Sequence, residues 1–114
     1  MIYLLLVNNV SYLAPIMDKF ITINFEFFGT TRILSGRKKL ALKVLCDGIA
    51  CWTLVSEALL QDVPQFLGEI IDVDNGKLLS SYTLNRNGMC FINYASADFF
   101  DNDTILMVPS MSGG

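Results

Sequence analysis

The stretch Ile21-Thr22-Ile23-Asn24-Phe25-Glu26-Phe27 alternates apolar and polar residues without interruption. Successive side chains of a β-strand point to opposite faces, so this pattern predicts a strand with one face on a core and the other toward solvent. The alternation breaks at Phe28-Gly29 and returns at Leu40-Ala41-Leu42-Lys43-Val44. The two strands are predicted to form a hairpin, joined by a polar connection over residues 30–38 that is longer than a tight turn.

Helical spacing follows the predicted hairpin. Val55, Ala58 and Leu59 recur at the spacing of one helix face, Trp52 lies one turn earlier, and Thr53 is the expected N-cap. Pro64 suits the first turn of a second short helix, whose apolar face is expected to hold Phe66, Leu67, Ile70 and Ile71. Both apolar stripes are interpreted as core packing against a sheet.

The second half of the chain predicts further strands. Turn dipeptides at Asn75-Gly76 and Asn87-Gly88 bound a predicted strand over residues 79–85, and a short strand is expected at 90–92. After the turn-forming Asp101-Asn102-Asp103, the nearly continuous apolar run Thr104-Ile105-Leu106-Met107-Val108 predicts a central strand. This order predicts an α+β fold of the β-grasp type, a mixed sheet of about four to five strands with one main helix and a short second helix. Its first and last strands should run parallel in the middle of the sheet.

Composition indicates one folded domain. The chain has 114 residues, of which 53% are hydrophobic and 17% charged, too apolar for a disordered chain. The net charge of −3 comes without any long block of one sign, which argues against a nucleic-acid partner. The sequence contains no His, so imidazole metal ligation and catalysis by a His base are excluded within this chain. We expect neither a metal site nor catalysis by the chain alone.

The cysteines indicate a reducing compartment. Cys46, Cys51 and Cys90 are odd in number and lack a repeated close spacing, which fits a cytoplasmic protein better than a disulfide framework. Cys46 and Cys51 have the C-x4-C spacing that opens a plant-type iron–sulfur loop, but the next ligand position is Leu54. Buried or half-buried structural thiols are therefore the preferred interpretation.

The N-terminal residues 1–19 are predicted to lie outside the domain. An apolar run over residues 2–7 is followed by Asn8-Asn9, without the basic segment of a signal peptide or the roughly 20 apolar residues of a membrane helix. We therefore expect no membrane association. Two alternatives stay open: an artefact of the chosen start site, or an added edge element of the sheet.

The C-terminal residues 110–114 read as a tail that follows a domain over residues 20–109. Pro109 is expected to stop sheet pairing, and Ser110-Met111-Ser112-Gly113-Gly114 holds nothing large or charged near its end. A Gly-Gly terminus has no β-carbons, so it fits a narrow channel and presents an unhindered carboxylate to another protein's active site. Attack of that carboxylate on the α-phosphate of ATP would give an acyl-adenylate. The alternative without function is a frayed chain end.

Several segments together resemble one family, the MoaD/ThiS sulfur carriers. They are Phe27-Phe28-Gly29-Thr30-Thr31-Arg32, then Asp74-Asn75-Gly76-Lys77-Leu78-Leu79, then Leu84-Asn85-Arg86-Asn87-Gly88, and finally residues 100–114 with acidic turn, apolar strand, proline and Gly-Gly in one run. The resemblance covers roughly residues 20–114. Chain length and the second helix are more similar to the molybdopterin synthase small subunit than to the thiamine-pathway carrier.

The resemblance implies a ubiquitin-like β-grasp protein whose terminal glycine, Gly114, is adenylated and converted to a thiocarboxylate. Gly113 and Ser112 would form the tail that enters a partner. The implied partners are an E1-like adenylyltransferase (MoeB/ThiF-like), which supplies ATP activation, and the molybdopterin synthase large subunit (MoaE-like), with no cofactor bound by the chain itself. A ubiquitin-like protein modifier, a thiamine-pathway carrier and a non-catalytic interaction module are the alternatives. The chain departs from the family at Ser110, Met111 and Asn102.

Two further expectations concern the surface. Family members often have an arginine at the place of Arg32, yet a solvated loop charge is the preferred interpretation. An apolar docking surface is expected to draw on Phe99, Phe100, Met107 and Met111, with burial an equal alternative for Phe99 and Phe100. Met111 lies beyond the last predicted strand and is the stronger candidate.

Overall fold

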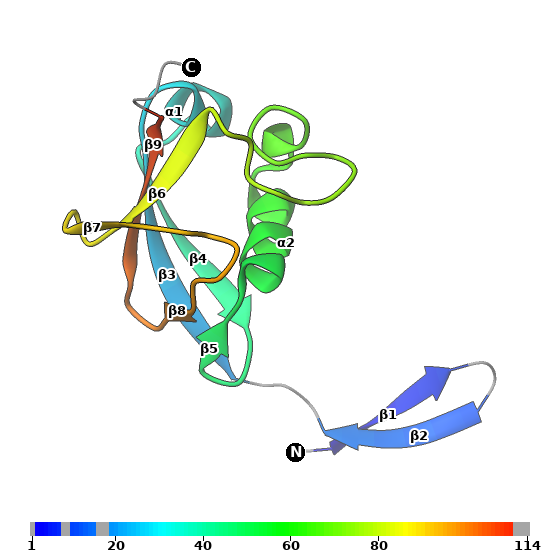
Figure 1. Cartoon of the computed structure of the whole chain (residues 1–114). Helices are drawn as coiled ribbons and strands as arrows, with labels where there is room; N and C mark the ends of the chain where they lie inside the picture. Colours follow the sequence, from blue (N-terminus) through cyan, green and yellow to red (C-terminus); the bar gives the residue numbers. More distant parts are fainter. Residues whose placement is uncertain (1, 8–9, 16–18, 111–114) are drawn as a thin grey trace.

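The structure is a computed structural model of the 114-residue chain and describes residues 2–7, 10–15 and 19–110, with side chains over 19–110. Figure 1 shows its elements, whose bounds are β1 Ile2–Val7, β2 Val10–Pro15, β3 Phe20–Phe27, α1 Thr30–Ser35, β4 Lys39–Leu45, β5 Ile49–Ala50, α2 Trp52–Asp62, the 3-10 turn η1 Pro64–Phe66, β6 Tyr82–Arg86, β7 Cys90–Ile92, β8 Phe99–Phe100 and β9 Thr104–Pro109.

The central sheet has five strands in the order β4-β3-β9-β6-β7. β3 and β9 pair in parallel, with Phe25 opposite Ile105 and Phe27 opposite Met107. The β3–β4, β9–β6 and β6–β7 pairs are antiparallel. The predicted β-grasp arrangement, with the first and last strands of the domain parallel in the middle, is confirmed.

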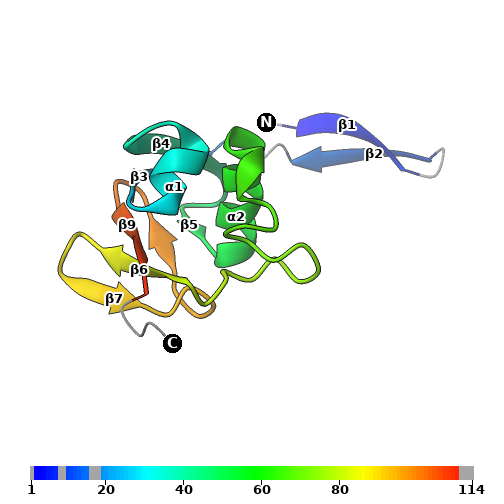
Figure 2. The same ribbon diagram turned by 90° about the horizontal axis from the view of Figure 1, so that it is seen from above.

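The alternation in β3 sets which face of the sheet is buried. Ile21, Ile23, Phe25 and Phe27 are at most 2% exposed, while the residues between them are half-buried on the other face. α2 packs against the buried face with Val55 and Leu59, and Phe66 of η1 meets the ring of Phe27 edge-on at 5.4 Å. Seen from above in Figure 2, the two helices lie on the same side of the sheet.

The connection between β3 and β4 differs from its prediction. Residues 30–35 form the short helix α1, which ends at Gly36 with φ 70°. A helix of six residues has too few positions to show a 3.6-residue repeat, so periodicity alone does not reveal it.

Three boundaries are also corrected. α2 starts at Trp52, with Cys51 in the cap position and no side-chain cap, so Thr53 lies inside the helix instead of capping it. The second helix is one 3-10 turn, and Leu67 just beyond it is 50% exposed. β6 begins only at Tyr82, because residues 79–82 form a turn in which Tyr82 N donates to Leu79 O at 3.1 Å.

Among the described residues, the N-terminal strands pair with each other and not with the main sheet. β1 and β2 form a separate antiparallel sheet, from Ile2 opposite Pro15 to Val7 opposite Val10. In the described part of the chain they add no strand to the edge of the five-stranded sheet. No helix in the described part of the chain is long and apolar enough to span a membrane.

Candidate functional site

The predicted carrier residues Gly114, Gly113, Ser112 and Met111 lie outside the described residues. The last described residue is Ser110, where the tail leaves the domain. The structure therefore shows the root of the tail and the groups that hold it.

Ser110 is joined to the turn that precedes β6. Its backbone N donates to Ser81 O at 2.8 Å, and its Oγ donates to Ser80 O at 2.7 Å. The chain is thus held through both backbone and side chain at residue 110. Ser110 departs from the family pattern, and in this chain the serine supplies both bonds.

Pro109 does not stop sheet pairing, contrary to its prediction. It lies opposite Tyr82 as the last residue of β9, and the ladder continues one residue further through Ser110 N and Ser81 O. In an antiparallel ladder this places residue 109 at a non-hydrogen-bonded position, where the missing N–H of proline costs no bond to β6.

Gly29 approaches the other side of Pro109. It has φ 62° and ψ −136°, a conformation available essentially only to glycine. A β-carbon here would lie 2.9 Å from Pro109 Cγ and 3.3 Å from the Tyr82 hydroxyl. The turn that starts α1 therefore packs closely on the root of the tail.

A small polar cluster lies under this contact. Thr31, fully buried, donates from its backbone N to the Tyr82 hydroxyl at 3.2 Å. Its Oγ1 donates to Phe28 O at 2.7 Å and accepts from Phe28 N at 3.1 Å. These bonds connect the β3–α1 turn to β6 directly beneath Pro109, so that three elements meet at the exit.

Arg32 is exposed, as expected for a solvated charge, but it lies in α1 instead of a loop. Its Nε donates to Phe27 O at 3.1 Å, and the guanidinium lies 5.4 Å from the centre of the Phe28 ring. Arg32 is the cation nearest in sequence to the close-packed Gly29.

The acidic turn lies at the opposite end of β9 and starts this strand. Thr22 N donates to Asp101 Oδ1 at 2.8 Å, and Phe100 N donates to Asp103 Oδ2 at 2.9 Å. Asn102 has φ 68°, a region that asparagine tolerates better than most residues. The turn thus aligns β9 beside β3 and so determines where the strand ends.

The predicted docking residues divide between core and surface. Met107 and Phe99 are fully buried, so the docking assignment is wrong for Met107, and for Phe99 the alternative of burial holds. Met107 lies opposite both Phe27 and Leu84 in the inward register of the sheet, and Phe99 packs 6.5 Å from the ring of Trp52. Phe100 is 42% exposed beside Arg86, and its docking role stays a prediction.

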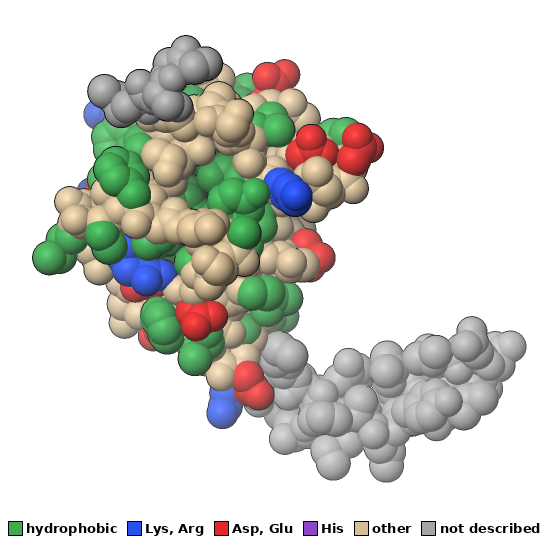
Figure 3. Space-filling view, viewed as in Figure 1, with side chains coloured by type: hydrophobic (Ala, Val, Ile, Leu, Met, Phe, Trp, Pro, Cys, Tyr) green, Lys and Arg blue, Asp and Glu red, His purple; other side chains and the backbone are tan. Residues whose placement is uncertain are grey.

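Other apolar side chains reach the surface near β7. Met89 and Phe91 are 85% and 65% exposed, and Figure 3 shows apolar groups gathered around β7 and β8. Neither residue could be identified from the sequence, because the segment around them lacks periodicity.

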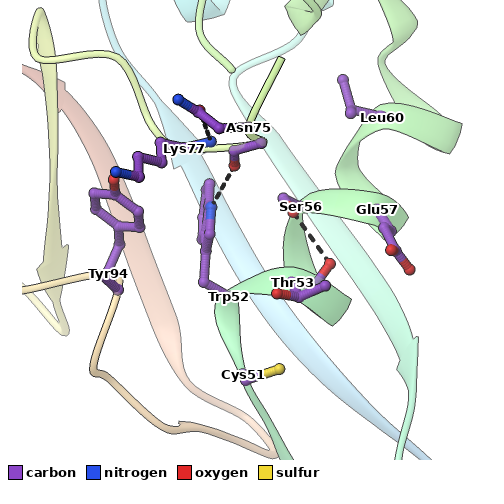
Figure 4. Close-up of a pocket in the computed structure, with 11 residues that line it drawn as sticks. Cys51, Trp52, Thr53, Ser56, Glu57, Leu60, Asn75, Lys77 and Tyr94 are labelled. Carbon is purple, nitrogen blue, oxygen red and sulfur yellow. Dashed lines mark hydrogen bonds between the residues drawn. The ribbon is translucent and has the colours of Figure 1, made fainter. Parts of the chain in front are cut away.

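A hollow of about 440 Å³ lies at the start of α2 (Figure 4). Trp52 Nε1 donates to Gly76 O at 2.8 Å, and the Trp52 ring meets Tyr94 edge-on at 5.1 Å. The Ser56 hydroxyl donates a hydrogen bond to Thr53 O. Trp52 therefore ties the two loops of this hollow to α2, which is a structural role.

The three cysteines are free thiols. Cys46 is buried as expected, but Cys51 and Cys90 are exposed, so the expectation of burial is wrong for these two. Within the described part of the chain, no three acidic or cysteine side chains gather as a metal site would require.

The fold is shared with small archaeal proteins. No protein-family model and no curated protein match the chain. The crystal structure of SAMP1 from Haloferax volcanii is 22% identical, with a TM-score of 0.63 over 82% of this chain and 99% of that one. The solution structure of small archaeal modifier protein 1 (SAMP1) from Methanosarcina acetivorans is 21% identical, with a TM-score of 0.63 over 84% and 99%.

A third similar structure is titled putative molybdopterin converting factor, subunit 1, from Pyrococcus furiosus. It is 19% identical, with a TM-score of 0.54 over 78% of this chain and 97% of that one. These likenesses show the ubiquitin-like β-grasp fold. The resemblance to MoaD/ThiS-type carriers is thereby confirmed at the level of the fold.

Proposed function

We propose that this chain is a ubiquitin-like carrier that is activated at the carboxylate of Gly114 and delivers sulfur in molybdopterin biosynthesis. The observation that carries the proposal is the end of β9. The central strand runs to an exit held by Ser110, and Met111-Ser112-Gly113-Gly114 follow it. A rigid domain that presents a small, unhindered carboxylate suits a group that must enter another protein's active site.

The chemistry divides between carrier and partner. The Gly114 carboxylate would attack the α-phosphate of ATP, release pyrophosphate and form an acyl-adenylate. A persulfide donor would then supply sulfur to the acyl carbon, AMP would leave, and reduction of the resulting S–S bond by a thiol would free the thiocarboxylate. The chain has no His to act as a base, so an E1-like adenylating enzyme would catalyse these steps.

Delivery of the sulfur would take place in a second partner, the large subunit of a molybdopterin synthase. The tail would enter its active site, and the exposed Phe100, together with Met111, would contact the partner surface. The similar Pyrococcus furiosus structure, titled as a molybdopterin converting factor subunit, supports this assignment.

A second candidate function is protein modification, which the names of the two modifier structures favour. It uses the same acyl-adenylate, but a lysine amine of a target takes the place of sulfur and an isopeptide bond forms. The two functions therefore differ in the nucleophile and agree on the activated atom.

Intact-mass spectrometry tests the proposal. The protein is incubated with ATP, a persulfide donor, a thiol reductant and each E1-like enzyme of the same genome, with a reaction lacking ATP as control. We expect replacement of one terminal oxygen by sulfur only when ATP is present. If neither adenylate nor thiocarboxylate forms with any of these enzymes, the carrier function is wrong. Lysine conjugates in host cells without thiocarboxylate would identify a modifier instead.

A further inference from the structure

The exit of the tail is contacted from two sides by other segments of the domain. The turn over residues 79–82 directs two consecutive carbonyls, those of Ser80 and Ser81, to the same residue, Ser110. From the other side, Gly29 approaches Pro109 so closely that no β-carbon fits between them. Residues 109 and 110 are therefore contacted by segments that lie far from them in the sequence.

We infer that Gly29, Ser80, Ser81 and Tyr82 form a clamp that fixes where and in which direction the tail leaves the domain, with Ser110 as its positioning residue. This inference rests on the proposed function, because it concerns how the carboxylate of Gly114 reaches a partner. Ser110 positions the tail and takes no part in the reaction itself.

The two bonds of Ser110 restrict different motions. The bond from its backbone N holds the peptide plane in the ladder, and the bond from Oγ fixes the side chain to one rotamer. Together they extend the ordered strand by one residue beyond Pro109. Without them residue 110 would lose its fixed direction, and more conformational freedom would be lost when the chain enters a partner.

The clamp also sets a length. Four residues follow Ser110 in the sequence, and each extended residue spans about 3.3–3.6 Å, so the group at Gly114 reaches at most ~14 Å from the root. The partner's adenylation centre must therefore lie within that depth of the surface that meets the clamp.

The experiment compares the full chain with Ser110→Ala, Ser110→Thr and Ser96→Ala. Ser110→Ala loses the hydrogen bond from Oγ to Ser80 O. Ser110→Thr keeps a hydroxyl and should retain this bond. Ser96→Ala controls for the loss of an exposed serine hydroxyl elsewhere in the domain. Amide hydrogen exchange of residue 110 reports on the clamp without any partner. Steady-state adenylation with the E1-like enzyme then gives KM and kcat for the carrier.

We expect the Ser110 amide to exchange more slowly than an open chain, and more rapidly in Ser110→Ala. The KM of Ser110→Ala should rise about two- to tenfold, the range set by loss of one hydrogen bond, while kcat stays within about twofold. Ser110→Thr and Ser96→Ala should match the parent protein in both measurements.

Exchange of the parent Ser110 amide at the open-chain rate would overturn the clamp whatever the function. A protected amide with an unchanged KM in Ser110→Ala would overturn the positioning role and leave the proposed function intact. A parent protein that is never adenylated would overturn the proposed function and the positioning role together, although the exchange data would still establish the clamp as a structural feature.

Discussion

Replacing Tyr82 with Phe removes a single oxygen atom from beneath the root of the tail. That oxygen accepts the backbone N–H of Thr31 at 3.2 Å, and the two residues are only 8% and 0% exposed. Leaving a buried N–H without its acceptor costs about 1–3 kcal/mol. The ring is retained, so the cavity term is small and the unsatisfied N–H dominates.

The free energy of unfolding of Tyr82→Phe is measured by urea denaturation, with Tyr94→Phe as the matched control. Each kcal/mol should lower the Tm of a domain of this size by roughly 4–8 °C, so a loss of at least ~4 °C is expected. Tyr94 packs on Trp52 without a hydrogen bond from its hydroxyl in the described part of the chain, so its change should stay within about 0.5 kcal/mol.

Amide exchange locates the effect of Tyr82→Phe. The Thr31 amide should exchange faster in this variant by more than the global loss of stability explains, because the bond that protects it is gone. If Tyr82→Phe and Tyr94→Phe unfold alike and Thr31 exchange is unchanged, the polar cluster beneath the exit does not hold α1 to β6.

Three further outcomes follow from burial and connectivity. Met107→Ala should lower the free energy of unfolding by about 2–5 kcal/mol, whereas Leu106→Ala on the half-buried face should cost clearly less, and equal losses by urea denaturation would contradict the register of β9. Deleting residues 1–18 should shift the Tm by no more than about 2 °C, because in the described part of the chain β1 and β2 pair with each other and with no strand of the domain; a larger fall would show that they support the domain. Deleting Gly114 should abolish thiocarboxylate formation in the mass assay and leave the Tm unchanged, and a shortened chain that still gained sulfur would place the activated carboxylate elsewhere.

The strands of the sheet were predictable because each is identified by the pattern of its own residues. The alternation in residues 21–27 and 40–44 and the apolar run at 104–108 each identify a strand without knowledge of its neighbours, and the structure confirms all three. The parallel pairing of β3 and β9 followed from the order of the elements. Two features were missed: α1 and the pairing of β1 with β2. A six-residue helix is too short to show a helical repeat, and composition does not specify which strands pair.

The candidate site was predictable only in part, for a related reason. Gly-Gly and the preceding strand indicate the tail by their position in the chain. The groups that hold its root are contributed by residue 29 and by residues 80–82, and only the fold brings them to residues 109 and 110. Pro109 was misread because proline disrupts a ladder only where its N–H is needed, and that depends on the register with Tyr82.

The structure separates what stabilises the chain from what the chain is proposed to do. The fully buried side chains of β3, β9, α2 and η1 form the core, whereas the proposed site of activation, Gly114, follows Ser110 in the sequence. We expect such a domain to tolerate changes in its tail without unfolding, so that tail composition can match the partner's channel. Sulfur transfer and lysine conjugation then require no different fold. Under the proposed function, the partner would supply the nucleophile, and the clamp at Ser110 would direct the tail toward that partner.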